Sequence, residues 1–184
     1  MKAKLKEDLC ALVDLLEEMP SDTPLYEVAG ETRVRATKLL WKHYSQSESV
    51  PALVEIEVYA RIALALLGPD RVPPLDQLDA CIVDAIHKQR ARFRDQKLSN
   101  VLTDSFDMDS WHCGTSHCRA GWAIHLHENG RALEKVFDSG VAGAIIYLRS
   151  TGNVPNFFAA QSTAWKAMNA EAAQQRAEAN ADSK

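Results

Sequence analysis

Apolar residues recur three or four positions apart along most of this chain, and that spacing predicts amphipathic helices. Leu5, Leu9, Leu12 and Leu16 fall on one side of a first helix, which ends before Pro20. The same spacing predicts further helices around residues 34–44, 50–67, 75–93, 117–129 and 138–151 and from 163 onward. We therefore expect a mostly α protein of about seven helices in a bundle-like arrangement.

Residues 99–108 interrupt the helical spacing and predict a short strand or an irregular connector. This stretch is also the best boundary between an N-terminal helical bundle (1–98) and a C-terminal helical part (99–170). Residues 171–184 are rich in Ala, Gln, Glu and Asn and show no apolar face, so we expect an exposed tail. The three parts are expected to form one compact unit.

Composition is that of an ordinary globular protein, with 46% hydrophobic and 25% charged residues. A formal net charge of −4 argues against bulk attraction to nucleic acid or to an anionic membrane. No apolar run reaches the ~18 residues needed to cross a bilayer, and acidic residues interrupt the N-terminal segment where a signal peptide would lie. We expect a cytoplasmic protein without membrane contact. Its cysteines would stay reduced there, and Cys10 and Cys81 are expected to be small core residues because they lie in apolar helical patterns.

The segment Asp109–Gly130, DSWHCGTSHCRAGWAIHLHENG, concentrates residues that can carry chemistry. It holds two of the four cysteines and four of the six histidines. Thr115 or Ser116 is a suitable N-cap, and Gly130 is a suitable residue to follow a helix, so the segment predicts a helix over His117–Asn129.

Zinc binding is one interpretation of this segment, with Cys113, Cys118, His112 and His117 as ligands. Ligands on one helix must lie three or four positions apart to share a face, and neither residue at those positions after Cys118 is a ligand. His125 lies about 10 Å further along the helix axis, too far for the same ion. We therefore expect no cofactor, with zinc as the alternative.

A cysteine nucleophile is a second interpretation. The N-terminus of a helix lowers the pKa of a thiol, and Cys118 or Cys113 could pair with His117 or His125 as the base. The residue types are present, but the sequence does not fix their geometry. A small Cys/His hydrolase, with or without zinc, is thus the enzymatic alternative.

The interpretation we favour is structural. Cys118, Trp122 and Leu126 lie four positions apart and form an apolar stripe. Small residues on this helix and on the next predict close packing of the two. They are Ala120, Gly121 and Ala123 on the first helix and Gly140, Ala142, Gly143 and Ala144 on the second.

The residues Cys113–Leu126, CGTSHCRAGWAIHL, resemble a pattern CGTxxCxAGWxxHL that is shared by uncharacterised phage and prophage proteins. The resemblance continues through ALEKVFDSGVAGAIIYL to VPNFFAA and covers roughly residues 106–160. It brings no known activity and therefore assigns no catalytic residues. What the resemblance implies is a phage or mobile-element origin, where small helical proteins often act by binding host or viral machinery.

A basic stretch at the end of the fourth predicted helix is a candidate for contact with phosphates. Its residues are Lys88, Arg90, Arg92, Arg94 and Lys97. Cations near a helix C-terminus are also favoured by the helix dipole, so a nucleic-acid-binding regulator is kept as an alternative.

The leading expectation is a non-catalytic binding or inhibitory protein that contacts a protein or nucleoprotein partner. An inhibitor of a host defence system, acting in the host cytoplasm, would fit the implied phage origin. A homodimer is compatible with this expectation.

Overall fold

The structure is a computed structural model of the 184-residue chain, and it is mostly α, as the apolar spacing predicts. It describes residues 1–44, 48–95, 105–108, 112–113 and 116–182, with only the backbone described at 95, 112, 113, 116 and 182. The helices of this described part are α1 (Ala3–Asp14), α2 (Leu25–His43), α3 (Ala52–Leu67), α4 (Leu78–Asp95), α5 (Arg119–Leu126), α6 (Gly130–Thr151) and α7 (Gln161–Asp182). The strands β1 (His112–Cys113) and β2 (Ser116–His117) form a short antiparallel pair.

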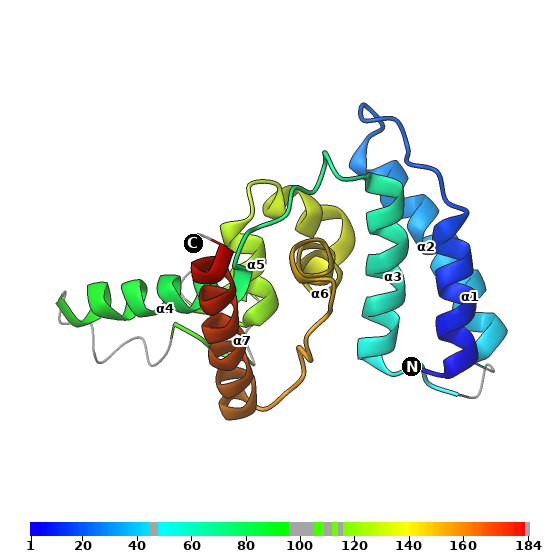
Figure 1. The fold of residues 1–184 in the computed structure, drawn as a ribbon. Coiled ribbons are helices and arrows are strands. Elements are labelled where there is room, and N and C mark those ends of the chain that lie inside the picture. Colours follow the sequence, from blue (N-terminus) through cyan, green and yellow to red (C-terminus); the bar gives the residue numbers. More distant parts are fainter. Residues whose placement is uncertain (45–47, 96–104, 109–111, 114–115, 183–184) are drawn as a thin grey trace.

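Helix α6 is at the centre of the fold. It packs against α5 on one side and against α3 on the other. Figure 1 shows α1, α2 and α3 together on one side of α6, and α4, α5 and α7 on the other. Helix α4 packs against α7 and α5, so in space it groups with helices of the second half of the chain. None of the described helices is both long and apolar enough to cross a bilayer.

The contact between α5 and α6 confirms the predicted packing of small residues. An added Cβ at Gly143 of α6 would lie 2.5 Å from Cβ of Ala120 in α5. Ala120, Ala142 and Ala144 are all fully buried. Because neither helix presents a large side chain at this point, the two backbones approach closely.

Helix α6 is interrupted at Asp138, whose φ of 67° lies in the left-handed region that non-glycine residues rarely adopt. The Asp138 carboxylate accepts a hydrogen bond from the backbone N–H of Val141 at 3.0 Å and so caps the second half of α6. That half begins where the sequence predicts a helix, around residue 138, and it ends as predicted at Gly152, which is left-handed. The first half, from Gly130, is not predicted by the sequence.

The helix of the Cys/His segment is shorter than predicted. It begins at Arg119, and its N-cap is Cys118 rather than Thr115 or Ser116. Gly130 does not follow this helix directly but begins α6, where a Cβ would meet the carbonyl oxygen of Ile124. Thr115 lies outside the described residues, as do residues 99–104 of the predicted connector. Phe106 forms an isolated bridge with His117, so the end of the connector pairs with β2.

Residues after 170, which we expect to be an exposed tail, continue a helix, and most of their described side chains are exposed. Helix α7 continues to Asp182. Ala164, Met168 and Ala172 are buried and lie four positions apart on the side of α7 that faces the rest of the protein. Two alanines and a methionine give only a weak apolar signal, which explains why the sequence pattern does not reveal this face.

The prediction that Cys10 and Cys81 are core residues is wrong, because both are exposed. Leu9 is buried next to Cys10, and Ala80 and Ile82 are buried on either side of Cys81. Successive residues of a helix point about 100° apart, so a small residue at the edge of an apolar stripe reaches solvent.

Candidate functional site

The described residues of the Cys/His segment before α5 form the short antiparallel strand pair β1–β2. In the β1–β2 pair His112 lies opposite His117, and Cys113 opposite Ser116. The backbone N–H of Asp107 donates to the carbonyl oxygen of His117 at 3.2 Å. The chain is therefore held in place from both sides just before the helix begins.

His117 packs as an aromatic residue between two other rings. It is 2% exposed, and its ring centroid lies 5.0 Å from that of Trp122 and 5.3 Å from that of His125. The indole N–H of Trp122 donates to the carbonyl oxygen of Ser105 at 2.9 Å. His125 is on the exposed side of this cluster. The cluster thus holds segment 105–107 against α5.

Cys118 is buried, and its sulfur atom caps α5. The residue is 1% exposed, and Sγ accepts a hydrogen bond from the backbone N–H of Gly121 at 3.4 Å. Burial raises the pKa of the Cys118 thiol above its usual value. Because the thiolate is the nucleophilic form, this environment argues against Cys118 as the nucleophile of a hydrolase.

The zinc alternative stays a prediction. Among the described residues, no group of three or more His, Cys, Asp or Glu side chains could hold a metal ion. The side chains of His112 and Cys113, two of the four proposed ligands, lie outside the described part of the structure. Sγ of Cys118, a third, is engaged as the N-cap of α5.

The most distinctive polar feature is a buried network centred on Arg119, the first residue of α5. Nη2 of Arg119 donates to Oδ1 of Asp79 in α4 at 2.7 Å, and Nε donates to the hydroxyl of Tyr147 in α6 at 2.9 Å. The Tyr147 hydroxyl in turn donates to Oδ1 of Asp79 at 2.8 Å. All three residues are at most 4% exposed. Three helices are thus joined by one buried, hydrogen-bonded polar cluster.

Helix α7 completes the network from the outer side. Glu171 forms an ion pair with Arg119. The side-chain amide of Gln175 donates to Oδ2 of Asp79 at 3.3 Å and accepts from the backbone N–H of Ala80 at 3.2 Å. Both oxygens of the Asp79 carboxylate are therefore hydrogen-bonded.

Electrostatics fix the protonation states of this network. Burial alone would lower the pKa of Arg119, but Tyr147 and Asp79 raise it well above its ordinary value. Burial raises the pKa of Tyr147 well above 10. The guanidinium stays charged and the phenol stays protonated, so both act as hydrogen-bond donors at neutral pH.

The network forms the floor of a cleft of about 910 Å³. The cleft lies between the segment that leads into α4, the end of α6 and the last turns of α7. Its lining residues include Asp76, Gln77, Asp79, Arg119, Tyr147, Ser150, Thr151, Asn153, Glu171, Gln174, Gln175 and Glu178. Four carboxylates face this space and only one guanidinium, while the remaining polar groups are amides and hydroxyls. The cleft is therefore acidic and rich in hydrogen-bonding groups.

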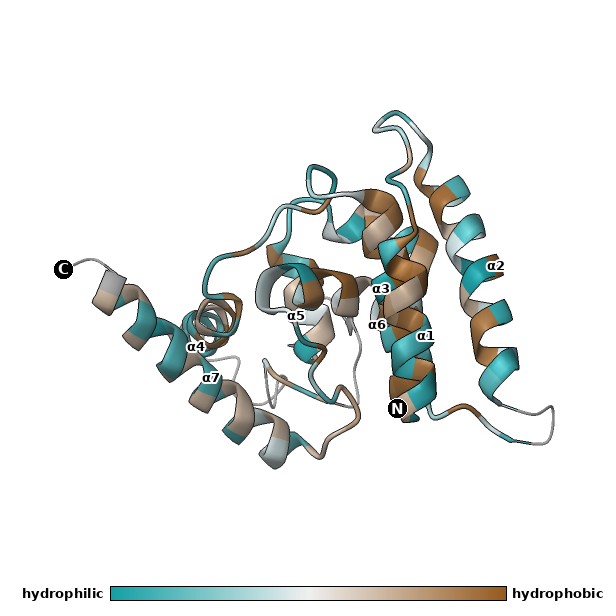
Figure 2. Ribbon diagram, turned by 45° about the vertical axis from the view of Figure 1, so that its right-hand side comes forward, coloured by the Kyte–Doolittle hydropathy of each residue, from teal (hydrophilic) through white to brown (hydrophobic). Residues whose placement is uncertain are grey.

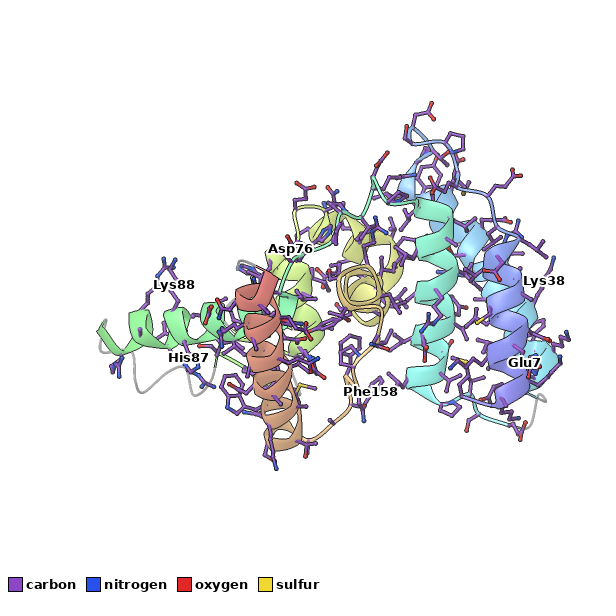
Figure 3. All side chains as sticks on the ribbon, viewed as in Figure 1. Glu7, Lys38, Asp76, His87, Lys88 and Phe158 are labelled. Carbon is purple, nitrogen blue, oxygen red and sulfur yellow. The ribbon has the colours of Figure 1, made fainter. Side chains whose placement is uncertain are left out.

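The described basic residues at the end of α4 differ in their surroundings. Lys88, Arg92 and Arg94 are exposed, but the guanidinium of Arg90 lies over the ring of Trp165, 4.9 Å from its centroid. Figure 3 shows Lys88 pointing away from the body of the protein. Lys97 lies outside the described residues. None of the four described residues of this stretch lines the cleft.

One feature of the sequence does indicate the polar network: Asp79 and Arg119 each lie on the apolar stripe of a helix. Asp79 precedes Ile82, Val83 and Ile86 by three, four and seven positions, so it lies on an apolar stripe. A charged residue at such a position is buried and must find a partner. Arg119 stands in the same relation to Trp122 and Ala123.

Comparison with known proteins adds no family or fold to these observations. No protein-family model, curated protein or solved structure matches the chain.

Proposed function

We propose that the protein is a non-catalytic binding protein, and that the cleft above Asp79, Arg119 and Tyr147 is a binding site for a small organic cation. The observation that carries this proposal is the buried ion pair at the floor of the cleft. A buried ion pair is often no more stabilising than apolar residues of the same volume. A network that opens onto a cleft of this size is better explained if it positions groups for a ligand.

The charge of the cleft lining defines the class of ligand. Arg119 is already engaged by Asp79 and Glu171, so an anion would meet a site with excess negative charge. Asp76 and Glu178 at the exposed rim add to that excess. A ligand with a primary ammonium or a guanidinium group matches the rim, and hydroxyl or amide groups on the ligand would match the Gln, Asn, Ser and Thr side chains. Polyamines and amino sugars belong to this class.

Proton positions in the cleft favour binding over catalysis. A general acid or base works best with a pKa near the operating pH. The raised pKa of Tyr147 keeps its proton in place, and the Asp79 oxygens are occupied by hydrogen bonds. Tyr147 and Asp79 are thus arranged to hold a ligand rather than to transfer protons. Outside the cleft, the Cys118 thiol is buried and its pKa is raised.

A reducing cytoplasm is the compartment that we propose. Cys10 and Cys81 are exposed free thiols, and exposed free thiols are most compatible with such a compartment. The resemblance to phage and prophage proteins supports a host cell as the setting, and inhibition of a host system stays part of this proposal.

Isothermal titration calorimetry at low ionic strength tests the cleft, with spermidine, agmatine and glucosamine as ligands and glutarate as a matched anion. We expect at least one cation to bind and glutarate to give no heat of binding. The double variant Asp76→Asn/Glu178→Gln should weaken cation binding about fivefold, because two rim charges contribute roughly 1 kcal/mol in total in a solvated site.

The control is Asp14→Asn/Asp22→Asn, which removes the same charge at exposed positions outside the cleft lining. It should bind like the unmodified protein. Absence of binding by every cation, or equal weakening in both double variants, would reject the cleft as the site.

A further inference from the structure

We propose that the outer face of α2 binds an acidic amphipathic helix of a partner protein. The outer α2 face is defined by Tyr26, Gly30, Val34, Lys38 and Trp41, which are spaced by three or four residues and so lie on one side of the helix. This face carries large apolar side chains in solvent, and Trp41 is 76% exposed. Figure 2 shows α2 at the edge of the molecule with brown, hydrophobic segments among teal ones.

These exposed residues are not needed for the core. Helix α2 already packs inward through Val28, Thr32, Ala36, Leu39 and Leu40, which are buried. The sequence pattern alone does not separate Val34 and Trp41 from this inner stripe, but the structure places them on the opposite side. Helix α2 thus has one apolar face against the fold and a second one in water.

The apolar surface continues from α2 onto α1. Leu15 at the end of α1 is 81% exposed. Together with Ala11, Leu12, Val34 and Leu39 it lines a shallow groove of about 550 Å³ between the two helices. Contiguous exposed apolar surface of this kind marks interaction sites in soluble proteins. Tryptophan in such a patch is a frequent anchor of binding energy.

Apart from Glu27 on α2 and Glu55, which lines a hollow together with Arg33, the uncompensated charge beside the outer α2 face is positive. Arg33 and Lys38 flank the apolar residues and are exposed, and no ion pair joins either of them to a described residue. The acidic residues of the groove are already engaged, because Asp8 pairs with Lys42 and Glu31 pairs with Arg35. In a protein with net charge −4, this is a local basic rim around apolar anchors.

A helix with apolar residues on one side and Asp or Glu along its flanks matches this surface in both shape and charge. Glu27 at the start of α2 is one exception, and it accepts a hydrogen bond from the Tyr26 hydroxyl. A second copy of the protein is a poorer match, because two outer α2 faces would bring Arg33 and Lys38 against one another. This proposal does not depend on the cleft, which is formed by other helices.

The proposal is tested with two designed peptides of the same apolar pattern. One has Glu at its flanking positions and the other has Lys, and both carry a fluorophore for anisotropy measurements. We expect the Glu peptide to bind and the Lys peptide not to bind. Trp41→Ala should weaken the complex about tenfold or more. Arg33→Glu/Lys38→Glu should abolish binding of the Glu peptide and create binding of the Lys peptide.

The matched control is Lys88→Glu/Arg92→Glu, which reverses two exposed charges on α4 and should leave peptide binding unchanged. Circular dichroism verifies that each variant is folded. Equal affinity for both peptides, or failure of the charge reversal to switch the preference, would overturn the proposal. So would sedimentation equilibrium showing a homodimer that Trp41→Ala dissociates, because the face would then be occupied by a second copy.

Discussion

Gly143 of α6 lies directly against Ala120 of α5, so close that a Cβ at Gly143 would come within 2.5 Å of the alanine Cβ and within 2.9 Å of its Cα. Both neighbours belong to helix backbones that are fixed by other contacts. Trp122, two positions after Ala120, donates its indole N–H to the carbonyl oxygen of Ser105. Tyr147, four positions after Gly143, belongs to the polar network. The contact therefore sets the distance between the two helices that carry Arg119 and Tyr147.

Gly143→Ala is expected to destabilise the protein by about 1–3 kcal/mol, because the added methyl group must push α5 and α6 apart. Urea unfolding followed by circular dichroism measures the change. Gly30→Ala is the control, since a Cβ there meets nothing within 4 Å. It should leave stability unchanged or raise it by up to about 1 kcal/mol, because alanine is the better helix former. Equal effects of the two substitutions would contradict the close contact.

Arg119→Met should destabilise the protein by about 3–5 kcal/mol, because it leaves the Asp79 carboxylate buried without its cation. The double variant Arg119→Met/Asp79→Leu should recover much of that loss, since it removes both charges from the interior. Urea unfolding of the single and double variants gives the coupling between the two residues. Additive effects, with no recovery in the double variant, would show that the pair is not energetically coupled.

Asp8 is predicted to stabilise the α1–α2 pair in a pH-dependent way. The ammonium of Lys42, followed by His43 and Lys4, lowers the pKa of Asp8 from 3.8 to about 2. A carboxyl group with a lowered pKa in the folded state contributes stability above its unfolded pKa and loses that contribution as the pH falls toward its folded pKa. The unmodified protein should therefore be more stable than Asp8→Asn at pH 6, and the difference should disappear between pH 4 and pH 2.

Unfolding by urea at several pH values measures this difference, and an NMR titration of the Asp8 carboxyl carbon measures the pKa itself. A midpoint near 4 would contradict the ion pairs seen between α1 and α2.

The rate at which each cysteine is alkylated should fall as its burial increases. Cys10 is exposed, and Cys81 is exposed but has its pKa raised, chiefly by burial of the sulfur and by Asp84. Cys118 is buried and its pKa is raised. Under native conditions Cys10 should be alkylated first, Cys81 more slowly, and Cys118 only when the protein unfolds.

Peptide mapping by mass spectrometry after timed alkylation resolves the individual cysteines. Elemental analysis of the same sample tests the zinc alternative. About one zinc per chain, with Cys113 and Cys118 protected until a chelator is added, would make the Cys/His segment a metal site.

The sequence predicts the helices well because their apolar spacing is a local property. The close contact between the helices of Ala120 and Gly143 is also predictable, because small residues on both helices allow their backbones to approach. The polar network is different. Arg119 meets Asp79 and Tyr147, which are 40 and 28 residues away, and no local pattern encodes that meeting. Only the position of each charge on an apolar stripe indicates that it needs a partner.

The errors have a common physical origin at the edges of helical stripes. Cys10 and Cys81 are one residue away from buried positions, and a rotation of about 100° takes them to solvent. Val34 and Trp41 look like core residues by type, yet the inner face of α2 is completed by Thr32 and Ala36. Residue type alone does not distinguish a face that packs within the fold from one that is left for a partner.

The bond between Gln175 and Asp79 joins residues 96 positions apart, and this separation has a consequence for how the protein is made. At roughly 5–20 residues per second, a ribosome needs about 5–20 s to add the intervening residues after Asp79. During that interval α1, α2 and α3 are already synthesised, and they carry every residue of the outer α2 face, although α2 and α3 also pack against the later helix α6. All residues of the outer α2 face are thus made well before the acidic cleft can be completed, because the cleft needs side chains of α7.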